Sequence, residues 1–177
     1  MPTPQELGDR PVPALYRFRE IHGLPHHPRA VVYSLSGHLD PAWPVFNTPG
    51  MDVIIVAADR AEATVSAPGL MAMGADVIVE SVREPAGLRR AHERLFADRG
   101  VRYLACEGGE RILRALHAAG LLDEVFVTVT DVVIDESARE GVLKVFDFEA
   151  EGADLIAEGK IASSSGWTFS RWRFNAR

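Results

Sequence analysis

A glycine pair between an apolar segment and an amphipathic segment is the feature of this sequence best suited to chemistry. Residues 103–113 read YLACEGGERIL, so Glu107-Gly108-Gly109 separates a strand-type run from residues at helical spacing. Glycines let a ligand approach the backbone closely, and the first N–H groups of a helix have no partner inside it. With the helix dipole, these donors favour a phosphate group. The pattern indicates an anion site, although a tight turn that needs glycine for steric reasons explains it equally well. It matches neither the GxGxxG nor the Walker fingerprint.

The glycine pair lies in an alternation of strand-type and helix-type segments that stops after Asp123. Asp52–Ala57 has the continuous apolar run of a strand buried on both faces. Apolar residues at helical spacing predict helices over Pro85–Arg99 and Gly109–Ala119, each ended by a glycine. Strand–helix repeats followed by strands alone predict an α/β fold with a mostly parallel sheet and antiparallel strands at its C-terminal end. The other predicted strands are Ala30–Ser34, Asp76–Glu80, Val101–Cys106, Glu124–Ile134, Val142–Phe148, Ala153–Glu158 and Trp167–Phe174.

The composition is that of a folded protein: 177 residues, 47% apolar and 25% charged, with a net charge of −6. This length suits one domain, or a domain with an appendage. No run approaches the roughly 20 apolar residues of a membrane-spanning helix, and the N-terminus lacks the features of a signal peptide. We therefore expect a cytoplasmic protein with no membrane partner. We predict an N-terminal arm or lead-in at residues 1–28, with a short helix at Ala14–Ile21, and a domain at residues 29–177.

Other residues that could do chemistry have simpler explanations. His22, His26 and His27 stand in a Pro-rich arm with no carboxylate or thiol spaced to complete a metal site. Cys106 precedes a glutamate, which opposes thiolate formation, so we interpret it as a small apolar core residue. Trp167–Arg173 interleaves aromatic and basic residues as a nucleic-acid platform does, but an edge strand explains the same pattern. We expect no metal and no nucleic-acid partner.

Two segments resemble the signature of the riboflavin-pathway pyrimidine reductases, the reductase domain of the bifunctional deaminase–reductase family. The run CEGGERILRALHAAGLLDEVFVTV (residues 106–129) looks like the family's E-G-G turn, helix and following strand. The run VVYSLSGHLD (residues 31–40) looks like its strand and Ser-x-Ser-Gly-x-Leu-Asp turn. They lie in the expected order, and the resemblance covers about residues 28–175. It implies a three-layer fold like that of dihydrofolate reductase.

The resemblance further implies an NADPH-dependent reductase, similar to 5-amino-6-(5-phosphoribosylamino)uracil reductase, that acts on a pyrimidine nucleotide-like small molecule. Glu107 matches a position that faces the substrate in the family, although a carboxylate near a helix N-terminus is stabilised without any ligand. Ser34–Ser36 would lie near the adenosine half of the cofactor, and Gly109–Ala115 would cradle its phosphates. No residue stands out as the proton donor. The implied cofactor-binding residues are Ser34, Leu35, Ser36, Gly108, Gly109, Glu110, Arg111, Ile112 and Leu113.

The chain departs from the family before Ala30. Family members begin with a strand that carries Ser-Leu-Asp-Gly, then a helix and a strand that ends in a Gly-x-Gly-Thr-like cofactor loop, and this sequence shows none of them there. A misassigned start, deliberate shortening and a relative that no longer catalyses are the open alternatives. Such a relative would bind a nucleotide or anion at Gly108-Gly109, or act as a dimerising subunit. Loss of a central strand would leave strand edges uncovered, so we expect a homodimer.

Overall fold

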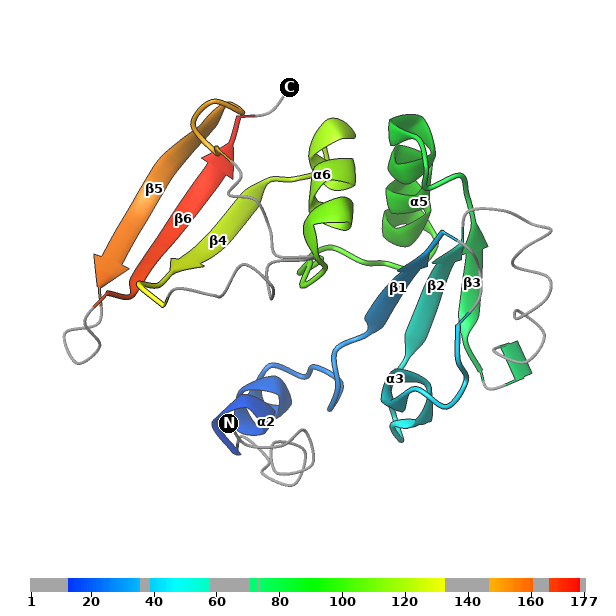
Figure 1. The fold of residues 1–177 in the computed structure, drawn as a ribbon. Helices are drawn as coiled ribbons and strands as arrows, with labels where there is room; N and C mark the ends of the chain where they lie inside the picture. The colour runs from blue at the N-terminus through cyan, green and yellow to red at the C-terminus, as the bar shows by residue number, and fades with distance from the viewer. Residues whose placement is uncertain are drawn as a thin grey trace. The chain divides into compact units, whose positions relative to one another are not determined.

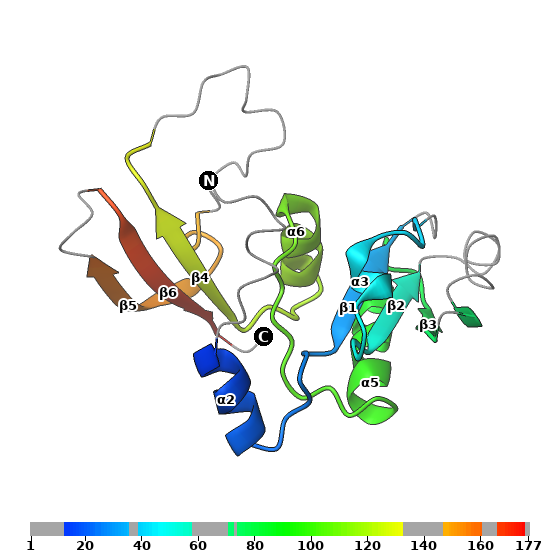
Figure 2. The same cartoon turned by 90° about the horizontal axis from the view of Figure 1, so that it is seen from below.

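The computed structural model describes residues 13–35, 39–57, 71–72, 74–132, 147–160 and 166–175. The chain divides into two compact units, Met1–Val79 and Glu80–Arg177, and each is described by itself (Figures 1 and 2). The predicted arm at residues 1–28 and domain at residues 29–177 stay predictions, and residues 1–12 lie outside the described ranges.

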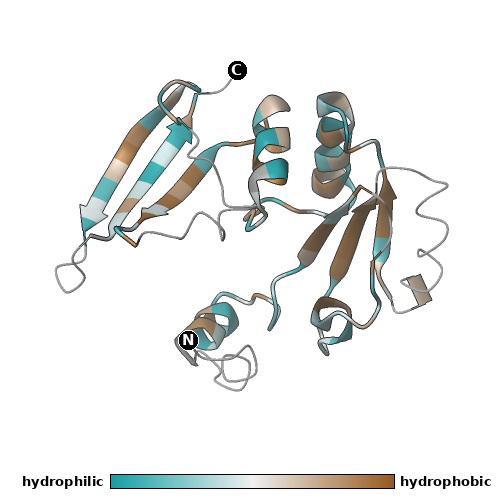
Figure 3. Ribbon diagram, viewed as in Figure 1, coloured by the Kyte–Doolittle hydropathy of each residue, from teal (hydrophilic) through white to brown (hydrophobic). Residues whose placement is uncertain are grey.

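The first unit is built on a three-stranded parallel sheet. Its strands are β1 (Ala30–Ser34), β2 (Val53–Ala57) and β3 (Asp76–Val79), in the order β1-β2-β3. All five residues of β2 are buried, as expected for a central strand with a continuous apolar run. The apolar colour of these strands in Figure 3 reflects that run. The strands predicted at these three places are confirmed.

One buried cluster of the first unit lies on one face of β2. Val53, Ile55 and Ala57 form a buried cluster with Leu39, and the short helix α3 (Pro44–Asn47) adds partly buried residues to it. Helix α2 (Pro13–Ile21) confirms the helix predicted at Ala14–Ile21.

The second unit contains the two helices predicted on either side of the glycine pair. Helix α5 covers Pro85–Ala97, and helix α6 covers Glu110–Ala118. The glycines expected to end them, Gly100 and Gly120, have φ angles of 65° and 66°. These angles lie in the left-handed region that glycine adopts without steric cost. The side chain of Arg89 donates a hydrogen bond to the carbonyl oxygen of Ala119 at 3.0 Å, which joins α5 to the end of α6.

A three-stranded antiparallel sheet completes the second unit. Its strands are β4 (Glu124–Val129), β5 (Ala153–Lys160) and β6 (Thr168–Phe174), in the order β4-β6-β5. The predicted α/β class is therefore confirmed, with a parallel sheet followed by antiparallel strands. Among the described residues the strands form two separate sheets. No helix in the described part of the chain is long and apolar enough to cross a membrane.

The strand predicted at Val101–Cys106 is wrong, because the structure has no regular secondary structure from Val101 to Gly109. Tyr103 is 97% exposed there. The strand predicted at Glu124–Ile134 ends at Val129. Most of the strand predicted at Val142–Phe148 lies outside the described residues, and its last two residues, Asp147 and Phe148, are not in a strand.

Candidate functional site

The glycine pair opens α6 as the sequence predicts. Gly109 is the N-cap residue, with φ −73° and ψ −173°, and no side chain forms a capping hydrogen bond there. Its carbonyl oxygen accepts the N–H of Leu113 at 3.2 Å. Glu107, Gly108 and Gly109 are all exposed. The first turn of α6 therefore presents N–H groups that the helix itself cannot satisfy.

The two glycines have different reasons for lacking a side chain. A Cβ at Gly108 would lie 2.1 Å from Cγ2 of Ile112, which is β-branched and stiff, so local packing explains Gly108. A Cβ at Gly109 would meet nothing within 4 Å among the described residues, and its φ is open to any residue. The steric explanation of the pair therefore holds for Gly108 and fails for Gly109. A bare N-cap leaves the helix terminus open to a ligand.

The other predicted cofactor residues fall in both units. Ser34 is buried at the end of β1 and Leu35 follows it exposed, whereas Ser36 lies outside the described residues. Arg111 is exposed, and Ile112 and Leu113 are half-buried on α6; the side chain of Glu110 is not described. A joint role of Ser34–Ser36 and the α6 terminus stays a prediction.

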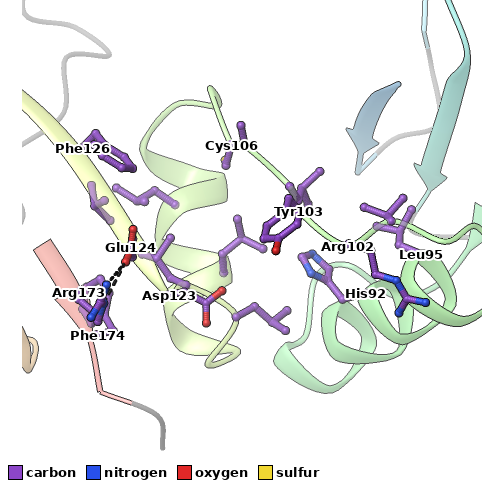
Figure 4. Close-up of a pocket in the computed structure, with 18 of the residues that line it drawn as sticks. His92, Leu95, Arg102, Tyr103, Cys106, Asp123, Glu124, Phe126, Arg173 and Phe174 are labelled. Carbon is purple, nitrogen blue, oxygen red and sulfur yellow. Dashed lines mark hydrogen bonds and ion pairs between the residues drawn. The ribbon is translucent and has the colours of Figure 1, made fainter. Parts of the chain in front are cut away.

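A cleft of about 1040 Å³ lies within the second unit, beside the chain that leads into the glycine pair (Figure 4). Residues 101–106 line it, and Cys106 is the last of them before Glu107. The remaining walls come from α5, α6, the loop after α6, and the strands β4 and β6. Sequence reasoning did not find this cleft, because several separate segments of the chain form it.

A carboxylate held by two guanidinium groups forms the polar wall of the cleft. Glu124 accepts hydrogen bonds from Arg171, the shortest at 2.7 Å, and from Arg173, the shortest at 2.8 Å. The β4–β6 register explains the cluster, since Glu124 pairs directly with Arg173, and Arg171 lies two residues away on the same face. The hydrogen bonds from Arg173 and Arg171 lower the pKa of Glu124. The cluster keeps a net charge of one positive unit.

Acid should weaken the fold through Glu124. Because its pKa is lowered in the folded protein, the unfolded chain binds this proton more readily. The stabilisation is therefore present above the unfolded pKa of about 4.3 and is lost as pH falls through the lower folded value. We expect Glu124→Gln to flatten the fall in melting temperature between about pH 5 and pH 2. Melting curves at stepped pH test this, with Glu158→Gln, an exposed carboxyl of β5, as the control. A Glu124→Gln curve that runs parallel to wild type would contradict it.

Two further side chains set the character of the opposite wall. Burial lowers the pKa of His92 and so favours the neutral form of the ring. The guanidinium carbon of Arg102 lies 4.2 Å from the ring centroid of Phe96, a cation–π arrangement.

The single cysteine, Cys106, is exposed rather than the core residue that we expected. No group of three or more His, Cys, Asp or Glu side chains in the described ranges could hold a metal ion.

Comparison with known proteins identifies the fold. No model of a known protein family matches the chain, and no curated protein is similar to it in sequence. A pyrimidine reductase-like protein from Corynebacterium diphtheriae has a similar structure, with a TM-score of 0.64 at 19% identity over 96% of this chain and 71% of the other. RibD from Acinetobacter baumannii is similar in two crystal forms, with TM-scores of 0.61 and 0.60 at 18% identity over 82% of this chain.

The chain therefore has the fold of the pyrimidine reductase-like proteins, as the sequence resemblance implies. It spans 37% of the length of RibD, so it corresponds to a part of that protein. This likeness concerns the fold, and the activity is argued separately below.

Proposed function

We propose that the protein is an NADPH-dependent reductase of a ribosylated aminopyrimidine in riboflavin biosynthesis, of the 5-amino-6-(5-phosphoribosylamino)uracil reductase type. The observation that carries the proposal is the bare N-cap at Gly109, which opens the terminus of α6 on a fold shared with pyrimidine reductase-like proteins. The cytoplasm is the compartment that we propose for it.

The residues present fit a dinucleotide phosphate. The N–H groups of the first turn of α6 would bind the phosphates, helped by the helix dipole. The missing side chain at Gly109 gives those oxygens room to approach the backbone. Ser34, Leu35 and Ser36 remain the proposed contacts of the adenosine half. When bound, NADPH supplies the hydride, so the protein has to bind and orient the two reactants.

Glu107 is the proposed substrate contact. It is exposed directly before the glycine pair, so a small molecule can reach its carboxylate. Carboxylate oxygens accept hydrogen bonds, which matches the amino and ribosyl hydroxyl donors of an aminopyrimidine nucleotide.

A fluorescence titration of the full chain with NADPH tests the binding step. We expect a saturable signal, and NADH in a matched titration reports the cofactor preference. The absence of saturation up to millimolar NADPH, with folding confirmed by circular dichroism, would refute the proposal. A second assay follows NADPH consumption with the phosphoribosylaminouracil. Saturable binding without turnover would instead identify a non-catalytic relative that binds a nucleotide at the Gly108-Gly109 helix entry.

A further inference from the structure

We draw no further inference here: the strongest candidate, the apolar face of helix α2 formed by Leu15, Phe18 and Ile21, is an exposed patch, and nothing in the structure shows what covers it.

Discussion

Replacement of Gly87 by alanine should destabilise the second unit by about 2 kcal/mol, although alanine is the better helix former. Gly87 is buried in the first turn of α5, and a Cβ there would lie 1.9 Å from the carbonyl oxygen of Ser81 and 2.6 Å from its carbonyl carbon. That oxygen also accepts the N–H of Glu84 at 3.3 Å, so the backbone at Ser81 cannot move away freely. Overpacking of this kind costs roughly 1–3 kcal/mol. Because backbone atoms must move, we expect an overpacking cost at the upper end of that range. The higher helix propensity of alanine offsets roughly 1 kcal/mol of this cost.

Thermal unfolding measures the outcome. The melting temperature should fall by about 4–8 °C for a chain of this length. The control is Ala86→Gly at the exposed neighbouring position, which should cost at most about 1 kcal/mol through helix propensity alone. A Gly87→Ala variant that is as stable as wild type would show that α5 does not approach Ser81 so closely in solution.

The elements predicted correctly are those whose signals are local. Helices α5 and α6 follow from apolar spacing and from a terminating glycine, and β2 follows from its continuous apolar run. The segment at Val101–Cys106 has an equally strong strand composition, but a strand exists only where another strand pairs with it. Whether a partner is present is a property of the tertiary arrangement, which no local pattern reveals.

In the candidate site, too, the sequence predicted the local feature and missed those that depend on tertiary contacts. The opening of α6 at Gly109 is a local feature, and the sequence located it to the residue. The sequence could not separate Gly108 from Gly109, because the distinction depends on where the side chain of Ile112 lies. The cluster of Glu124 with Arg171 and Arg173 depends on the register of two strands, and Glu124 and Arg171 are 47 residues apart in the chain. A signal was present in the alternate arginines of β6, but we interpreted them as charges of an edge strand. That interpretation is wrong, because β6 is the middle strand of its sheet.

Replacement of Gly109 by aspartate should stabilise the protein and weaken NADPH binding in one step. Aspartate is a preferred N-cap residue, its Cβ would meet nothing within 4 Å, and the φ of −73° suits it. Capping over glycine and the favourable dipole term together should add about 0.5–1 kcal/mol to the free energy of unfolding. The same carboxylate would occupy the N–H groups that we assign to phosphate and would repel its charge. Loss of one charge-assisted hydrogen bond, about 1.5–3 kcal/mol, corresponds to roughly 10- to 100-fold weaker binding.

The two effects have opposite signs, so a general loss of structure cannot imitate them. Gly109→Asn separates the causes, because asparagine caps the helix but carries no charge. Its NADPH affinity should lie between those of wild type and Gly109→Asp, while its stability rises by a few tenths of a kcal/mol. Thermal unfolding and NADPH fluorescence titration on the same three proteins give both quantities. If wild type binds NADPH and Gly109→Asp binds it equally tightly, the cofactor phosphates lie elsewhere, since a carboxylate at this N-cap and a phosphate on the same N–H groups exclude each other.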